Sequence, residues 1–422
     1  MSRKRVIYQS EALYVGPTGE GATAVQLHRV QSANYSFDIA RTDVNQFGQL
    51  ARIDNLIMES PTVSLDFTYY PTSGGEEANM GFNVEAGLHA DDAIYSSALG
   101  SILSGTTDIK NYFIVTSAEG SDLNTSTAAN DWKSVIGLGN MSITSYSVDG
   151  SVGDFVTASV SCEGLNMIVD TSGYIGAQST GTTTDTFAAS GVSNPAVEVS
   201  NGNAVRGKQF LSTASTHVPT TWGVTDQKVS ALQPKDVMFT LGAIESGSVG
   251  VDANDLKLQS FSIGVDLGRT PLEKLGSRFA FSREIDFPVT ATMDISANMG
   301  EMKLAWTGDG AGAKATVPGS VTWGDIGGSV PHGGVEHIVE NDTAEYDLAV
   351  CVKPDNAVTA TGYGLKWSLN GAKLDSQSFS SSIGDNKSVD FSFSTQIGGP
   401  NDLTHGLRMT RLTGINDCAN LG

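Results

Sequence analysis

Alternating hydrophobic and polar positions recur in short segments along the chain and predict β-strands. In two places a glycine–aspartate pair, Gly153-Asp154 and Gly384-Asp385, separates consecutive segments, which is typical of a β-hairpin turn. The alternating segments are Tyr35–Ile39, Pro61–Phe67, Ser142–Val148 and Val156–Cys162, followed by Val265–Leu267, Val289–Ile295, Lys373–Phe379 and Val389–Phe393.

The order of these segments repeats, which indicates an internal duplication. Residues Gln31–Asp66 align with Gln259–Asp294 without a gap at a shift of 228, with nine identities over 36 positions. A second block, Ser145–Ser161, aligns with Ser376–Ser392 at a shift of 231. Two blocks in the same order at nearly the same shift predict two related domains. The identities of the first block include Asp38 with Asp266, Arg41-Thr42 with Arg269-Thr270, Gly48 with Gly276, and Asp66 with Asp294.

One helix is expected, over Asp91–Leu103, where apolar pairs recur every four residues and Gly105 provides a stop. The corresponding segment of the second repeat, Gly308–Gly334, is rich in glycine and shows no such stripe, so its helix is expected to be weak or absent. Between the repeats, 12 of the 20 residues in Thr171–Ser190 are Ser, Thr or Gly. We therefore predict a first domain at 1–170, a linker or surface insertion at 171–232, a second domain at 233–398 and a C-terminal arm at 399–422.

Composition agrees with an all-β protein and argues against nucleic-acid recognition as its main role. Charged residues are only 17% of the chain, and their balance gives a net charge of −21, which repels phosphate backbones. Such a charge suits a wall along which DNA slides without sticking, although it also keeps an abundant protein in solution. Three cysteines without a CxxC pair predict no disulfide framework, and no apolar run predicts a signal peptide or a membrane span.

The motifs that usually reveal catalysis are incomplete. Gly202–Lys208 has phosphate-loop spacing, but Gln209 stands where a magnesium-binding hydroxyl is required. His332 and His337 lack further zinc ligands, and Asp252–Asp255 lacks the remainder of a calcium loop. We therefore expect a non-enzyme with no cofactor and no metal. A polysaccharide-degrading β protein stays open as an alternative, because paired carboxylates can lie far apart in a chain.

The segments Val30–Leu50, Glu59–Phe67, Asp108–Ile114, Ile143–Asp154 and Gly268–Phe279 resemble the tail tube (major tail) proteins of long-tailed bacteriophages. The resemblance implies a mainly β fold in which each domain is a sandwich or barrel of two packed antiparallel sheets with a flanking helix. It also implies rings of six such domains, hence three of these chains, stacked into a tube. The implied partners are further copies, the tape-measure protein, tail terminator and baseplate or tip proteins, passing DNA, and in some tails a sheath. The implied location is the virion tail, assembled in the host cytoplasm. A capsid decoration protein or an adhesin is the structural alternative.

Two long connections are the best candidates for contacts between rings, because a loop longer than its hairpin needs is usually functional. They are Ala40–Met58 and its counterpart Gly268–Asp286; a plain strand extension with a wide turn is the alternative. Asp66 and Asp294 alternate with apolar neighbours and are the candidates for the lumen. The contact candidates are Arg41, Thr42, Asp43, Phe47, Arg52, Arg269, Thr270, Glu273, Lys274 and Arg278.

Overall fold

The computed structural model describes two main parts of the chain, here called the first half (11–171) and the second half (256–412). The mainly β class predicted from the sequence is confirmed. No helix among the described residues is long and apolar enough to cross a membrane. The described residues are 11–19, 23–86, 97–117, 132–171, 256–299, 345–352, 364–381, 386–399, 402 and 405–412, with isolated strand segments at 192–194, 199–200, 203–204, 209–211, 237–241, 306–307 and 314–315.

Within these ranges the elements follow one another as strands with two short helices. The first half contains β1 (Glu11–Pro17), β2 (Thr23–Leu27), β3 (Val30–Asp38), β4 (Arg41–Val44), β5 (Asp54–Ile57), β6 (Thr62–Tyr69), α1 (Gly75–Met80), β7 (Val84–Ala86), α2 (Gly100–Leu103), β8 (Ile109–Ser117), β9 (Trp132–Ser151), β10 (Thr157–Gly164) and β11 (Asn166–Thr171). The second half contains β17 (Leu256–Asp266), β18 (Arg269–Leu272), β19 (Ser282–Ile285), β20 (Val289–Met299), β23 (Tyr346–Val352), β24 (Gly364–Ser380), β25 (Ser388–Ile397) and β26 (Gly406–Leu412).

Short strands lie between these elements. They are β12 (Val192–Asn194), β13 (Val199–Ser200), β14 (Asn203–Ala204), β15 (Gln209–Leu211), β16 (Val237–Leu241), β21 (Trp306–Thr307) and β22 (Lys314–Ala315). Of these, β15 pairs in parallel with β2, and β16 pairs antiparallel with β23, so both extend sheets of the two halves.

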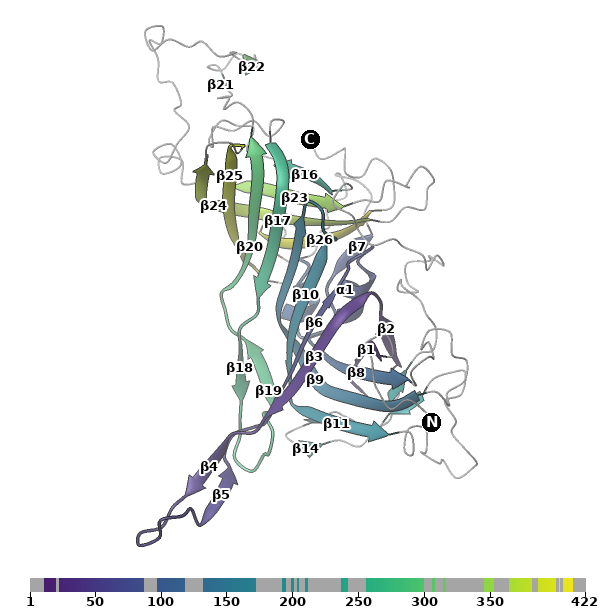
Figure 1. Cartoon of the computed structure of the whole chain (residues 1–422), viewed down its shortest axis with the longest axis vertical. Helices are drawn as coiled ribbons and strands as arrows, with labels where there is room; N and C mark the ends of the chain where they lie inside the picture. Colours follow the sequence, from purple (N-terminus) through teal and green to yellow (C-terminus); the bar gives the residue numbers. More distant parts are fainter. Residues whose placement is uncertain are drawn as a thin grey trace.

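One antiparallel layer, here called the inner sheet, runs through both halves in the order β3, β6, β10, β9, β17, β20, β25, β24 (Figure 1). Strand pairing in the second half repeats that of the first. Ser161 pairs with Ser145 and Cys162 with Ile143, with a bulge between the two pairs. The same bulge separates the pairs Ser392–Ser376 and Phe393–Leu374. The shifts of 228 and 231 read from the sequence therefore also relate the hydrogen-bonding registers.

The long strands β9 and β24 each turn a corner and enter a second sheet. Their N-terminal parts pair with β8 and β11, and with β23 and β26. At the corners Asn140 and Gly371 adopt left-handed φ angles of 54° and 61°, which asparagine and glycine tolerate best. The N–H groups of these two residues donate to the side chains of Asn111 and Asp347, each at 3.0 Å. Each half is thus two packed sheets joined through one bent strand.

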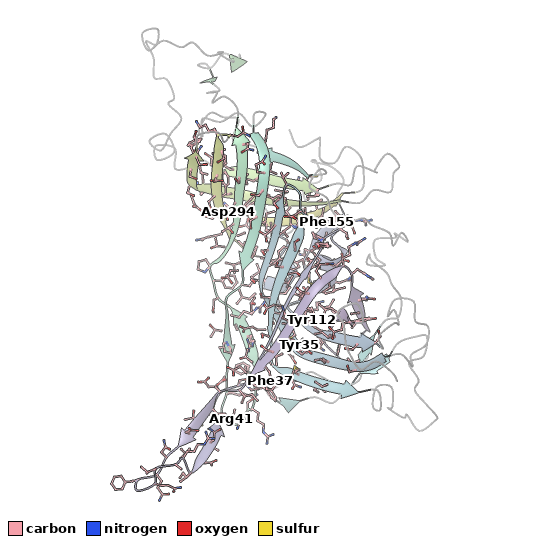
Figure 2. The ribbon with its side chains drawn as sticks, viewed as in Figure 1. Tyr35, Phe37, Arg41, Tyr112, Phe155 and Asp294 are labelled. Atoms are coloured by element: carbon pink, nitrogen blue, oxygen red, sulfur yellow. The ribbon has the colours of Figure 1, made fainter. Side chains whose placement is uncertain are left out.

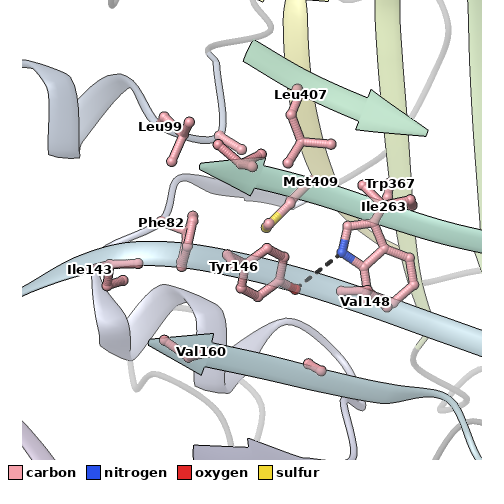
Figure 3. Packing of buried hydrophobic residues seen from close by; sticks show 14 of the residues in the cluster. Phe82, Leu99, Ile143, Tyr146, Val148, Val160, Ile263, Trp367, Leu407 and Met409 are labelled. Carbon is pink, nitrogen blue, oxygen red and sulfur yellow. Dashed lines mark hydrogen bonds between the residues drawn. The ribbon is translucent and has the colours of Figure 1, made fainter. Parts of the chain in front are cut away.

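A single apolar cluster continues from one half into the other. Tyr146 of β9 and Trp367 of β24 are both buried, and the Trp367 indole Nε1 donates to the Tyr146 hydroxyl at 3.3 Å (Figure 3). In the outer layer, β26 pairs in parallel with β7 of the first half. The two halves therefore share a core and join through strands in both layers.

The predicted strands coincide with observed ones, whereas the predicted helix is only partly described. Gly100–Leu103 is helical, and 87–96, where the helix was expected to begin, lie outside the described residues. So do the turn at Gly384-Asp385, most of the predicted linker and nearly all of Gly308–Gly334. Part of the predicted C-terminal arm is strand β26 of the second half. Cys351 is disulfide-bonded, so the expectation of no disulfide is wrong for this residue, while Cys162 is a buried free thiol.

Candidate assembly surfaces

The inner sheet crosses between the halves where β9 pairs with β17, a boundary here called the internal joint. Val148 lies opposite Ile263, and Tyr146 lies opposite Val265. All four side chains are at most 3% exposed, because the packed second layer covers their face. At the end of this pairing the Leu267 N–H donates to the Thr144 carbonyl at 2.7 Å. The internal joint is therefore a fully formed strand pair with a buried apolar side.

The two outer edges of the inner sheet, β3 and β24, are the repeat counterparts of β17 and β9. Within the described residues β3 pairs only with β6, and residues 373–380 of β24 pair only with β25. Tyr35 and Phe37 are 40% and 57% exposed, although their counterparts Ile263 and Val265 are buried. Phe379 is 44% exposed, whereas its counterpart Val148 is 0% exposed. Both edges thus present apolar side chains at the positions that the internal joint buries.

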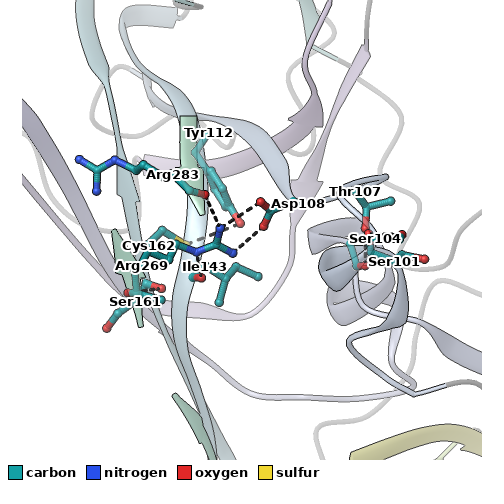
Figure 4. A network of polar contacts seen from close by, with 12 residues as sticks. Ser101, Ser104, Thr107, Asp108, Tyr112, Ile143, Ser161, Cys162, Arg269 and Arg283 are labelled. Atoms are coloured by element: carbon teal, nitrogen blue, oxygen red, sulfur yellow. Dashed lines mark hydrogen bonds and ion pairs between the residues drawn. The ribbon is translucent and has the colours of Figure 1, made fainter. Parts of the chain in front are cut away.

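The β18–β19 hairpin of the second half docks on the first half through Arg269 (Figure 4). The guanidinium binds both carboxylate oxygens of Asp108, Nη1 to Oδ2 at 2.9 Å and Nη2 to Oδ1 at 2.5 Å. Nε donates to the Ile143 carbonyl at 2.9 Å, and the Arg269 side chain is 0% exposed. A buried, bidentate pair of this kind fixes orientation as well as position.

A second arginine, Arg283, completes this docking. Its guanidinium forms an ion pair with Glu163 and donates to the Thr62 hydroxyl at 3.2 Å. The Ser60 N–H donates to the Glu273 carboxylate at 3.0 Å, and the Ala280 N–H donates to the Ser60 hydroxyl at 2.9 Å. Sequence comparison did not single out Arg283, because the repeat places Asn55 at the equivalent position.

The equivalent hairpin of the first half, β4–β5 with its connecting residues 40–58, is here called the arm, and it projects beyond the body (Figures 1 and 2). Its Arg41 is exposed and makes one weak contact, from Nη1 to the Asn55 Oδ1 at 3.5 Å. Apolar side chains along the arm are exposed as well: Phe47, Leu50, Ile53, Leu56, Ile57 and Met58. A projecting apolar surface of this kind marks an interaction site.

The contact candidates named from the sequence divide between the two hairpins. Thr42, Asp43, Phe47 and Arg52 lie on the exposed arm, where Arg52 pairs with Asp43 at 2.8 Å. Hydrogen bonds from Asn55 and Arg52 hold the pKa of Asp43 below its usual range. On the docked hairpin, Thr270 donates to Asp286 and Lys274 lies over the Phe281 ring, while Arg278 is exposed. Arg269 and Glu273 bind the first half, so we reassign these two to the contact between the halves.

Asp66 and Asp294, the lumen candidates, are both exposed and lie on one face of the inner sheet. A row across this face aligns Asp149, Ser262, Asp294 and Ser392, with the two serine hydroxyls donating to the neighbouring carboxylates at 2.6 Å. Asp266 and Asp390 share the face. A hollow of about 920 Å³ over this row is lined by serines, aspartates and aromatic residues, without histidine, lysine or arginine among its described lining residues.

Two buried carboxyl groups lie beneath the contact between the halves, and sequence reasoning missed both. Burial, followed by the neighbouring Glu77, raises the pKa of Glu76 to about 8, and burial also raises the pKa of Glu77. Glu77 accepts from the Tyr69 hydroxyl at 2.7 Å. Burial raises the pKa of the Cys162 thiol to about 12, which makes that thiol unreactive. The described residues contain no group of acidic, histidine or cysteine side chains that could hold a metal ion.

Comparison with known proteins assigns no family. No family model and no curated protein matches the chain. Among the solved structures that match is a chain of the anti-feeding prophage baseplate, a sixfold-symmetrised assembly seen by cryo-electron microscopy. The match has 9% identity and a TM-score of 0.24, and it covers 40% of this chain and 97% of the other. At this TM-score we draw no argument from the likeness.

Proposed function

We propose that the protein is the structural subunit of a bacteriophage tail tube, closing into rings by pairing β3 of one copy with β24 of the next. The observation that carries this proposal is that the two edge strands, which have no second pairing partner among the described residues, are repeat counterparts of the two strands in the internal joint. Unpaired edges with exposed apolar residues are templates for pairing with another chain. The resemblance of the sequence to tail tube proteins points the same way.

The register of the internal joint predicts the register between copies. Ser147 lies opposite Gly264 in the joint, so Ser378 of one copy is expected opposite Ser36 of the next. Likewise Val148 opposite Ile263 predicts Phe379 opposite Tyr35, which covers both exposed rings. Head-to-tail pairing of this kind closes when the rotation per copy divides a full turn. With eight inner strands per chain, three copies give a barrel about 48 Å across between backbones, at ~4.8 Å per strand and a tilt of roughly 40°.

The acidic face of the inner sheet becomes the lumen in this arrangement. Asp66, Asp149 and Asp294 then line a channel that repels phosphates, so DNA passes without binding. The protein needs neither cofactor nor catalysis for this role. Its partners are further copies, the tape-measure protein, terminator and baseplate or tip proteins, with or without a sheath, in the virion tail.

The proposal is tested by cross-linking through an engineered cysteine pair. Ser36→Cys with Ser378→Cys places two thiols directly opposite each other between copies, while within one chain the two strands are at opposite edges of the inner sheet. Cys162 is buried and Cys351 is disulfide-bonded, so these two natural cysteines do not compete. The matched control, Ser32→Cys with Ser376→Cys, uses the same two strands and the same face but sets the thiols about six residues out of register.

We expect mild oxidation to link the first variant into dimers and closed trimers on a non-reducing denaturing gel, with little linkage of the control. Electron microscopy of the same sample is expected to show rings or tubes. Rings with equal linkage of both variants would contradict the register. Isolated particles at high concentration, with no linkage, would favour a capsid decoration protein or an adhesin.

A further inference from the structure

The arm of the first half lacks the receptor that its counterpart has. Arg269 and Arg41 occupy equivalent positions as the first residues of β18 and β4, at the same shift that relates the paired strands. Arg269 is bound by Asp108 and the Ile143 carbonyl, whereas Arg41 faces solvent. The difference between the two hairpins is therefore the presence of a receptor and not the chemistry of the arginine.

The second half offers a carbonyl group and a nearby carboxylate at the corresponding corner of β24. The bulged register makes Leu374 the counterpart of Ile143, because each precedes the same bulge opposite Phe393 or Cys162. The strand registers match Tyr346 opposite Ala372 with Lys110 opposite Met141, so Glu345 occupies the position of Ile109, one residue after that of Asp108. The Glu345 carboxylate is half exposed, and among the described residues it contacts Lys373 at 3.9 Å and His405 at 3.7 Å.

We propose that the root of the arm docks on the second half of the neighbouring copy in the same ring, with Arg41 binding the Leu374 carbonyl and the Glu345 carboxylate. This inference rests on the proposed function, because pairing of β3 with β24 is what brings the two together. In the internal joint, Asp266 lies opposite Ser145 and the Leu267 N–H reaches the Thr144 carbonyl. With the same register between copies, the Ile39 N–H of one copy donates to the Asp375 carbonyl of the next. Arg41 lies two residues after Ile39 and so reaches the same corner.

Docking of the arm root also accounts for the exposed Ile57, because its counterpart Ile285 is partly buried and packs against the core. Ile53 is expected to stay exposed, since its counterpart Phe281 is 47% exposed on the docked hairpin. The arm tip stays free after docking, since Leu275, the counterpart of Phe47, is fully exposed even on the docked hairpin. The arm root therefore binds the neighbouring copy within a ring, and the arm tip stays available to contact the next ring.

The test compares Arg41→Ala, Glu345→Ala and the double variant, each measured by the protein concentration at which tubes form in sedimentation and light scattering. Glu284→Ala is the control, because Glu284 is an exposed charge on the docked hairpin whose carboxylate accepts a hydrogen bond from Ser282 of the same hairpin. Asp375→Ala tests the other carboxylate at this corner, which lies in the β24 bulge. All variants are also made in the Ser36→Cys, Ser378→Cys background, so that edge pairing is followed independently.

We expect Arg41→Ala and Glu345→Ala each to raise the assembly concentration about tenfold or more, and the double variant to be no worse than either. Glu284→Ala and Asp375→Ala are expected to stay within about threefold of the unaltered protein. Unchanged assembly of Arg41→Ala while Ser36 and Ser378 still cross-link overturns the arm docking and leaves the tube proposal standing. The assigned pair is also overturned if the effects of Arg41→Ala and Glu345→Ala on the assembly concentration multiply in the double variant. A tenfold effect of Asp375→Ala in place of Glu345→Ala would overturn it as well. Absence of cross-linking and rings in the parent overturns both proposals.

Discussion

Two hairpins at corresponding positions of the repeated segments differ in their surroundings. The β18–β19 hairpin is bound through Arg269 and Arg283, whose side chains are 0% and 6% exposed. The arm carries an equivalent Arg41 in solvent, beside Phe47 at 104% and Leu50 at 109% exposure. The strands that lead into the hairpins differ in the same way, since Ile263 is buried and Tyr35 is not. The comparison shows that one chain contains a buried interface between its halves. It also carries two exposed surfaces that correspond to the two sides of that interface.

The largest expected contrast comes from placing a charge at equivalent positions of β17 and β3. Ile263→Lys buries an unpaired ammonium in the internal joint and is expected to prevent folding, at a cost of several kcal/mol. Tyr35→Lys places the same charge on the exposed edge, so we expect less than about 1 kcal/mol of destabilisation but no rings. Circular dichroism with urea titration and electron microscopy measure the two effects. Rings formed by Tyr35→Lys would contradict the role given to this edge.

The two arginines should differ next. In the Tyr35→Lys background, which removes assembly, Arg269→Ala leaves Asp108 unpaired at a buried site and is expected to cost about 3–5 kcal/mol of unfolding free energy. Arg41→Ala in the same background removes only an exposed contact and is expected to change that free energy by less than about 0.5 kcal/mol. Urea titration measures both. Equal effects would mean that the arm is already docked in the single chain.

The pH dependence of stability tests whether the contact between the halves rests on buried neutral carboxyl groups. The pKa of Glu76 is raised to about 8, so the folded state keeps a proton that the unfolded chain loses above its ordinary value of 4.5. Unfolding free energy is therefore expected to fall as pH rises from 5 to 8, by roughly 3 kcal/mol from this group, at up to ~1.4 kcal/mol per pH unit. Glu76→Gln should flatten that slope. A slope unchanged by Glu76→Gln, measured by urea titration across the range, would contradict this account.

The smallest effect is expected at the hydrogen bond between the halves. Trp367→Phe keeps an aromatic ring in the core but removes the indole donor to the Tyr146 hydroxyl. We expect a loss of about 1–2 kcal/mol in unfolding free energy, because a buried hydroxyl loses its partner and some volume is lost. Thermal unfolding of the Tyr35→Lys background measures it. A neutral result would show that the Tyr146 hydroxyl is satisfied by Glu77, which lies 3.5 Å away.

Strands with one solvent-exposed face were predictable from the sequence, and strands that are buried on both faces were not. In β6 and β10 buried residues alternate with less buried ones, which is the pattern that alternation detects. In β8, seven consecutive residues from Asn111 are buried, so no alternation exists to read. The corner at Asn140 leaves no pattern that a single sequence reveals, although the Asn140–Gly371 correspondence follows from the repeat once the register is known.

Partners between distant segments were beyond sequence reasoning. Arg269 was singled out by the repeat, but Asp108 as its partner depends on β8 lying beside β9. Arg283 and Glu163 have no repeat counterparts of the same kind, since Asn55 and Ser394 stand at the equivalent positions. The carboxyl groups of Glu76 and Glu77 lie in a short helix whose polar sequence gives no hint of burial.

The most direct test of the central claim is cryo-electron microscopy of the assembled protein at a resolution that separates strands. The account predicts three chains per ring, a continuous antiparallel barrel, and β3 of one copy beside β24 of the next with Ser36 opposite Ser378. It also predicts that Asp149 and Asp294 face the lumen. Rings joined through the outer layers, with β3 and β24 still unpaired, would contradict the account.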